Sequence, residues 1–134
     1  MPAPDPRFAL ALTAFERALA RLHEVLAVNE TSIVRDALIQ RFEFTFEAAW
    51  KAAYRWLRAR GAAVAEEAFA VLPRALANGL IDDEAVWTEI RTRRNQTSHT
   101  YDEALAIAVA AFVRREAAPA FDRLLAVLKA RADE

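Results

Sequence analysis

Apolar residues recur at steps of three and four along most of the chain, and this periodicity constrains the fold more than any other feature. Near the start of the chain one such stripe consists of Phe8, Leu12, Phe15, Leu19, Leu22 and Leu26. The spacing places these side chains on one face of an α-helix. Two glycines interrupt 134 residues that are rich in Ala, Leu, Glu and Arg, all strong helix formers. The sequence therefore predicts an all-α protein.

Capping residues mark the first two predicted helices. Asp5 precedes a proline, which is a good helix start because the aspartate accepts a backbone hydrogen bond and proline fits the first helical position. Thr31 or Ser32 offers the next start, so a second helix is expected over about residues 33–60. Gly61 can then end that helix in a left-handed conformation.

The second predicted helix is apolar on more than one side. Its main stripe consists of Val34, Leu38, Phe42, Phe46, Ala49, Ala53 and Leu57. Further aromatic side chains lie partly off that stripe, namely Phe44, Trp50, Tyr54 and Trp56. Such a helix lies either at the centre of a bundle or at a subunit interface. Packing is therefore the favoured role for these aromatic residues, ahead of base stacking.

Three more helices are expected in the rest of the chain. The third covers about residues 65–78 and contains Pro73, and Gly79 follows its end. Asp82 or Asp83 begins the fourth helix.

The fifth predicted helix begins after Thr100, because Thr100 and Glu103 have the spacing of a capping box. Pro119 is expected to bend this helix. Five helices with short connections predict a five-helix up-and-down antiparallel bundle. The length, with no repeat or change of composition, predicts a single domain over residues 1–134.

Composition disfavours several classes of function. The chain has no cysteine, and its two histidines are far apart in sequence, so no metal site is expected. A net charge of −1 provides no broad basic surface, so RNA or a nucleotide would need a local patch. No apolar run reaches the roughly 18 residues of a membrane span, and the N-terminus lacks the apolar segment of a signal peptide. We expect a soluble, cytoplasmic protein without membrane contact.

A dense polar cluster occupies residues 91–103, between two amphipathic helices. Its candidate substrate-binding residues are Arg91, Arg93, Thr97 and Ser98. Arg94 provides a forked cation that suits a phosphate, and His99 can exchange a proton near neutral pH. Together they could cleave RNA without a metal, with the histidine moving protons and the arginine stabilising the phosphate.

Helix geometry limits this chemistry. Five residues along a straight helix turn by about 500°, which leaves Arg94 and His99 about 140° apart. Asn95 is four residues before His99 and shares its face. Arg94 and His99 can meet if the helix unwinds between them, or if two copies of the chain face each other.

A structural role for the cluster is an equally good interpretation of the residues alone. Its side chains could cap helix carbonyls and bond to Asp82, Asp83 or Glu89. His23 is expected to be an ordinary surface or packed histidine. Charged residues on the second helix are expected to form a solvated face with local ion pairs, unless that face meets the cluster; they are Arg35, Arg41, Glu43 and Glu47.

Three blocks of the sequence resemble the nucleotidyltransferase substrate-binding protein family, within the HEPN superfamily of small helical bundles. The blocks occur in the expected order and are residues 34–51, 79–81 and 94–103. The R-x4-H-x-Y signature of the family falls on Arg94, His99 and Tyr101. Pro73 is where the chain looks less typical of the family.

The resemblance implies a homodimer or homotetramer, and a separately encoded minimal nucleotidyltransferase as partner. In that pair this chain would bind the substrate or nucleotide. ATP and Mg²⁺ would belong to the partner, so this chain would need no cofactor. The chain lacks the G-S and paired-aspartate elements of a nucleotidyltransferase catalytic subunit, so it should not transfer nucleotides alone.

The resemblance has a second implication, from HEPN toxins of toxin–antitoxin pairs. By that likeness the chain would be a metal-independent endoribonuclease in which Arg94 and His99 are catalytic and Asn95 supports them. The partner would silence it by adenylylation of Tyr101. A third hypothesis is a non-catalytic structural oligomer whose interface the polar cluster stabilises.

Overall fold

The computed structural model describes residues 5–132, which form helices and connecting turns without a strand. Residues 1–4 and 133–134 of the predicted domain lie outside this part. The elements are α1 (Pro6–Leu26), α2 (Ser32–Ala59), α3 (Ala68–Ala77), α4 (Glu84–Gln96), the 3₁₀-helix η1 (Thr97–His99), α5 (Glu103–Phe112), the π-helical segment η2 (Val113–Ala117) and α6 (Ala118–Ala130). No helix of the described part is both long and apolar enough to cross a membrane.

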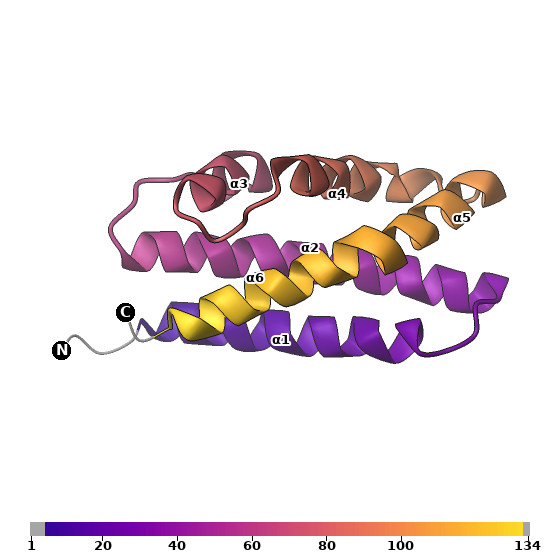
Figure 1. Ribbon diagram of the computed structural model, residues 1–134, viewed down its shortest axis with the longest axis horizontal. Coiled ribbons are helices and arrows are strands. Elements are labelled where there is room, and N and C mark those ends of the chain that lie inside the picture. Colours follow the sequence, from indigo (N-terminus) through magenta and orange to yellow (C-terminus); the bar gives the residue numbers. More distant parts are fainter. Residues whose placement is uncertain (1–4, 133–134) are drawn as a thin grey trace.

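The chain passes up and down the bundle (Figure 1). α1 and α2 form a long antiparallel pair, α3 and α4 follow each other along the next pass, and α5, η2 and α6 form one continuous pass back. Counting this last pass as one bent helix, the described residues form the predicted all-α five-helix bundle, and that prediction is confirmed.

Local capping signals operate at most helix ends. Asp5 Oδ1 accepts a hydrogen bond from the Arg7 amide at 2.9 Å. Of the alternatives left open by the sequence, Thr31 caps α2 and Asp83 caps α4. Gly61 and Gly79 have φ angles of +84° and +72°, the left-handed conformation expected after α2 and α3.

Two predicted helix starts are wrong. α3 begins at Ala68 and not near residue 65. α5 is capped by Asp102, whose Oδ1 accepts hydrogen bonds from the amides of residues 104 and 105, and not by Thr100. The 3₁₀ turn of η1 directs the Thr100 hydroxyl back to the Thr97 carbonyl, to which it donates at 3.0 Å, so it cannot cap the next helix.

A π-helical turn lies directly before Pro119, where a bend was expected. The Ala118 amide donates to the Val113 carbonyl, five residues back. Proline has no N–H, and its ring would clash with the carbonyl of Arg115, four residues earlier. Widening the turn accommodates the ring and keeps the helix continuous.

α2 lies at the centre of the bundle and contacts all of the other α-helices. One aromatic cluster joins Phe42 of α2 to rings of three other helices. The centroid of the Phe121 ring lies 6.1 Å from that of Phe42, 6.5 Å from that of Phe15 and 5.7 Å from that of Trp87. Trp50 and Trp56 are buried, whereas Phe44 is 60% exposed. The sequence predicted that this helix lies either at the centre of a bundle or at a subunit interface. Within a single copy of the chain, α2 takes the central position.

A cluster of charges ties the α1–α2 connection to the π-helical segment. Glu30 accepts hydrogen bonds from Arg35 Nε at 2.9 Å and from Arg114 Nε at 3.0 Å. Arg114 also donates to the carbonyl of Leu26 at 3.0 Å. Burial raises the pKa of Glu30, but the hydrogen bonds and charges of the two arginines outweigh it and hold the pKa below its ordinary value of 4.5.

Replacing Glu30 by glutamine should lower the free energy of unfolding at neutral pH. Because the pKa of Glu30 is lower in the folded state, this stabilisation is complete above about pH 4.5 and is lost as pH falls through the lowered pKa. Urea unfolding of wild type and Glu30→Gln from pH 7 to pH 3 should therefore show two stabilities that converge in acid. Glu24→Gln, a change at a carboxylate that is 64% exposed, is the control. An equal difference at all pH values would contradict the prediction.

Candidate functional site

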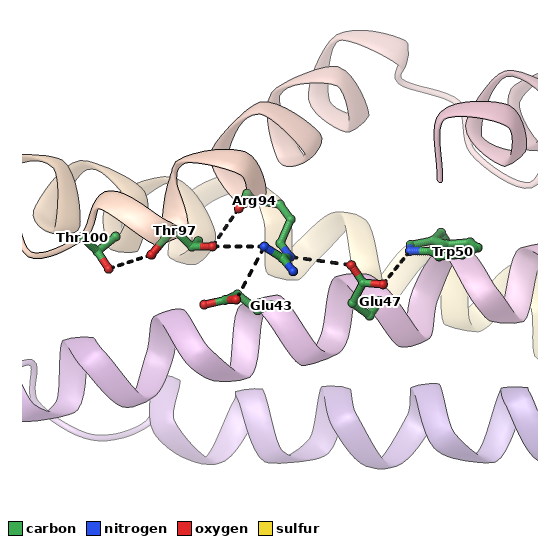
Figure 2. A network of polar contacts seen from close by, with 6 residues as sticks. All are labelled: Glu43, Glu47, Trp50, Arg94, Thr97 and Thr100. Atoms are coloured by element: carbon green, nitrogen blue, oxygen red, sulfur yellow. Dashed lines mark hydrogen bonds and ion pairs between the residues drawn. The ribbon is translucent and has the colours of Figure 1, made fainter. Parts of the chain in front are cut away.

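The Arg94 side chain extends from α4 towards two carboxylates of α2 (Figure 2). Its Nη1 lies 3.6 Å from Glu43 Oε2, and its Nε lies 3.6 Å from Glu47 Oε1. Nη1 also donates to Thr97 Oγ1 at 3.3 Å. The carboxylates are four residues apart, so one turn of α2 presents both of them to the same guanidinium. The charged face of α2 therefore does meet the polar cluster.

Short hydrogen bonds hold the surroundings of Arg94 in place. Thr97 Oγ1 donates to the Arg94 carbonyl at 2.7 Å, which closes the last turn of α4. Trp50 Nε1 donates to Glu47 Oε2 at 3.1 Å, and this bond orients the carboxylate (Figure 2). Thr97 is buried, and its role here is to position the arginine and the helix end.

The guanidinium itself is held by charge more than by hydrogen bonds. Both carboxylate contacts are longer than a hydrogen bond, and within the described residues the buried Nε has no hydrogen-bond partner. One cation faces two anions, so the local charge is negative. The Arg94 side chain is 32% exposed. An approaching phosphate would reach Arg94, but it would compete with Glu43 and Glu47 for it.

His99 and Tyr101 lie on the surface, at and just after the end of η1. Their rings meet edge to face, with centroids 6.2 Å apart, and Tyr101 is 86% exposed. The α-helix does tighten into a 3₁₀ turn before His99, as a meeting with Arg94 would require. Even so, within residues 5–132 no hydrogen bond or ion pair joins His99 to Arg94. The contacts within one copy of the chain therefore do not join His99 to Arg94.

The other candidate residues have different environments. Arg93 binds Glu89 at 2.9 Å, contacts Gln96 at 3.4 Å and packs over the Phe112 ring, so it faces α5. Asn95 and Ser98 are exposed. His23, on α1, is an exposed histidine whose Nε2 lies 2.7 Å from Asp122 Oδ1 of α6.

An open groove of about 500 Å³ lies beside Arg94, between α2, α4 and the start of α3. From the polar cluster it is lined by Arg91, Arg94 and Asn95. From the other elements it is lined by Phe46, Glu47, Trp50, Glu66, Glu67, Ala68 and Phe69. Arg91 lies over the exposed ring of Phe69, with its guanidinium carbon 5.5 Å from the centroid.

Sequence reasoning did not assign Glu43, Glu47, Trp50 or Phe69 to the site. The only signal for the glutamates was their spacing on one face of the second helix, and many solvated helices share that spacing. Nothing in the sequence around Phe69 indicated that it belongs to the site. In the described part of the chain, no group of three His, Asp or Glu side chains could hold a metal ion.

Comparison of the sequence with known proteins gives two matches. A family model described as "Nucleotidyltransferase substrate binding protein like" matches residues 10–130. A curated relative, the probable ribonuclease HepT of Haemophilus influenzae, is 41% identical over 89 residues. That alignment covers 60% of this chain, and the chain spans 60% of the length of the relative.

Two solved structures have a similar fold. The crystal structure of ttk003001694 from Thermus thermophilus is 37% identical, with a TM-score of 0.73 over 90% of this chain and 99% of that one. HI0074 from Haemophilus influenzae is 27% identical, with a TM-score of 0.65 over 91% of this chain and 96% of that one. Its structure is described as revealing the fold of a substrate binding domain of a nucleotidyltransferase.

Arg94→Ala should leave stability nearly unchanged, because a partly exposed ion pair contributes about 0–1 kcal/mol. Urea unfolding measures this. Ile90→Ala, which removes a fully buried side chain of the same helix, should cost about 2–5 kcal/mol and shows that the assay senses the packing of α4. A loss with Arg94→Ala as large as that with Ile90→Ala would identify the ion pairs as a structural device.

Proposed function

We propose that this chain, which belongs to the nucleotidyltransferase substrate binding protein-like family, binds a nucleotide or other substrate for a separately encoded minimal nucleotidyltransferase. HI0074, described as having the fold of a substrate binding domain of a nucleotidyltransferase, supports this role by likeness. ATP and Mg²⁺ are then supplied to the partner's active site, and this chain holds the substrate. Because that reaction uses ATP, we place the pair in the cytoplasm.

The groove beside Arg94 is the observation that carries this proposal. It combines the forked donors of Arg91 and Arg94, which suit a phosphate, with the exposed Phe69 ring, on which a base can stack. Its carboxylates, Glu47 among them, disfavour a ligand that is only an anion. They favour one that also offers hydrogen-bond donors, as nucleobases with exocyclic amino groups do.

A nucleotide titration tests the groove. Trp50 lines it, so its fluorescence should report the addition of AMP or ATP. Arg91→Ala should weaken binding about tenfold or more, since a hydrogen bond to a charged group contributes about 1.5–3 kcal/mol. Arg17→Ala, which removes an exposed arginine from α1, should bind as wild type does. Equal affinities of the two variants would exclude the groove as the site.

A second function has its own support, namely a metal-independent endoribonuclease that the partner silences at Tyr101. Tyr101 is 86% exposed beside His99, so the active site of another protein can reach its hydroxyl. The name of the Haemophilus influenzae relative supports ribonuclease activity by likeness. In this function Arg94 would stabilise the phosphate, His99 would move protons and Asn95 would support them.

This second function requires a rearrangement or a second molecule. Glu43 and Glu47 form ion pairs with Arg94, and no hydrogen bond or ion pair of the described residues joins His99 to it. RNA would have to displace the carboxylates, or a second copy of the chain would have to bring another cation to His99. Arg91 lines the groove and takes part in no ion pair within the described residues, so a substrate can bind there without either change. We place the substrate-binding role first for that reason.

Mass spectrometry separates the two functions. The protein is incubated with ATP, Mg²⁺ and the nucleotidyltransferase partner, with Tyr101→Phe as control, and RNA cleavage by unmodified protein is assayed in parallel. Addition of AMP at Tyr101 together with loss of RNA cleavage would establish the silenced ribonuclease. If RNA stays intact and Tyr101 stays unmodified while the two proteins still purify together, the silenced ribonuclease is excluded. The substrate-binding role would then remain.

A further inference from the structure

A second hollow lies between α3 and α4, next to the groove beside Arg94. Each of these helices packs on α2, whereas the two pack little on each other. Figure 1 shows both of them along the edge of the bundle opposite α1. The hollow, which we call the α3–α4 pocket, has a volume of about 220 Å³. Because the two helices do not close on each other, space for a small molecule remains between them.

The wall of the pocket is apolar. α3 contributes Leu72, Pro73 and Leu76 to it, and Ile81 and Trp87 complete it. Leu72, Ile81 and Trp87 are buried in the bundle, so the core holds this wall in place. Water in such a hollow has few hydrogen-bond partners, and its replacement by an apolar group is favourable. The wall therefore favours a ligand with an apolar body.

Three polar side chains of α4 form the rim of the pocket, namely Glu84, Thr88 and Arg91. They follow one another at steps of four and three residues, so they share one face of the helix. Within the described residues, the ion pairs of α4 are those of Arg93 and Arg94, and neither Glu84 nor Arg91 takes part in one. A carboxylate and a guanidinium are therefore both available to a ligand, at opposite ends of the rim.

We propose that the α3–α4 pocket binds a small aromatic acid whose ring carries a hydroxyl or amino group opposite its acid group. The volume sets the size of the ligand. An apolar cavity of about 150 Å³ holds a benzene ring, so this pocket has room for one ring with a short substituent at each end. Arg91 binds the carboxylate with its forked donors, and Glu84 accepts a hydrogen bond from the hydroxyl or amino group.

The spacing of the rim and the chemistry of the wall agree with this class of ligand. Seven residues separate Glu84 from Arg91, which is about 10 Å along the helix axis, and a ring with substituents at both ends bridges such a separation. The indole of Trp87 offers an aromatic surface to the ring. Inorganic phosphate would leave the apolar wall in contact with water, and a purely apolar ligand would use neither Glu84 nor Arg91.

Arg91 borders both the α3–α4 pocket and the groove beside Arg94. Its guanidinium carbon lies 5.5 Å from the centroid of the Phe69 ring, on the groove side. A guanidinium has five N–H groups, so Arg91 can bind one anion from each hollow. The aromatic acid would then be held beside the nucleotide as a second substrate. That assignment rests on the proposed function, whereas binding in the pocket does not.

Titration of methyl-labelled protein with 4-hydroxyphenylacetate, followed by NMR, tests the pocket. The methyl signals of Leu72, Leu76 and Ile81 should shift saturably, and that of Leu10, exposed on α1, should not. The probe 4-methylphenol lacks the carboxylate and should bind about tenfold or more weakly, and phenylacetate lacks the hydroxyl and should bind about threefold or more weakly. Absence of a saturable shift at millimolar probe, or equal affinities for 4-hydroxyphenylacetate and 4-methylphenol, would overturn the proposal.

Variants assign the contacts, with circular dichroism as the check on folding. Arg91→Ala should abolish the preference for 4-hydroxyphenylacetate over 4-methylphenol, and a variant that keeps this preference would overturn the role of Arg91. Thr88→Trp fills the pocket and should prevent binding of both probes, whereas Thr13→Trp, at an exposed threonine of α1, should bind them as wild type does. Equal binding by these two variants would place the probes elsewhere.

A titration in the presence of saturating AMP tests the relation to the nucleotide. 4-Hydroxyphenylacetate should still bind, because the two ligands occupy different hollows on either side of Arg91. Mutual exclusion of the two ligands would overturn the assignment as a second substrate. If AMP does not bind at all, the proposed function fails, and the titrations without AMP still decide whether the pocket binds an aromatic acid.

Discussion

The burial of α2 is the constraint on which the rest of the structure depends. This helix is apolar on more than one side, and each large apolar side chain left in water would cost about 1.5–3 kcal/mol. It therefore packs against all of the other α-helices, with Phe42 beside the central Phe121. The charged residues of α2 lie on the parts of its surface that this packing leaves uncovered, Glu43 and Glu47 among them. Because Trp87 and Ile90 anchor α4 in the same core, Arg94 comes to lie against those two carboxylates.

The result is a site in which the parts are present but separate. Arg94 is bound to α2, while His99 and Tyr101 face solvent beyond the end of α4. Chemistry that needs an arginine and a histidine together therefore needs a second molecule or a displaced carboxylate. The groove beside Arg94 suits binding, and the exposed Tyr101 suits contact with another protein. The proposed ribonuclease depends on such a change, whereas the proposed substrate binding at the groove does not.

Sequence reasoning was most successful where the signal is local. Asp5, Gly61 and Gly79 act within one turn of backbone, and the structure confirms each of them. It failed at Thr100, because the choice between capping α5 and bonding to the preceding turn depends on how η1 is wound. The polar cluster was located from its composition. Its contacts with Glu43 and Glu47 were not predicted, because they join helices some fifty residues apart in the chain.

The sequence by itself determined the helices, the antiparallel bundle, the family likeness and the position of the polar cluster at a helix end. These follow from periodicity, capping and motif spacing, which act over one or a few turns of backbone. The tertiary structure alone decided that Arg94 points towards α2 and that His99 and Tyr101 point outward. At a helix junction the direction of a side chain depends on which distant elements pack beside it. Here α2 places two carboxylates beside Arg94, whereas none of the described elements covers the histidine and the tyrosine.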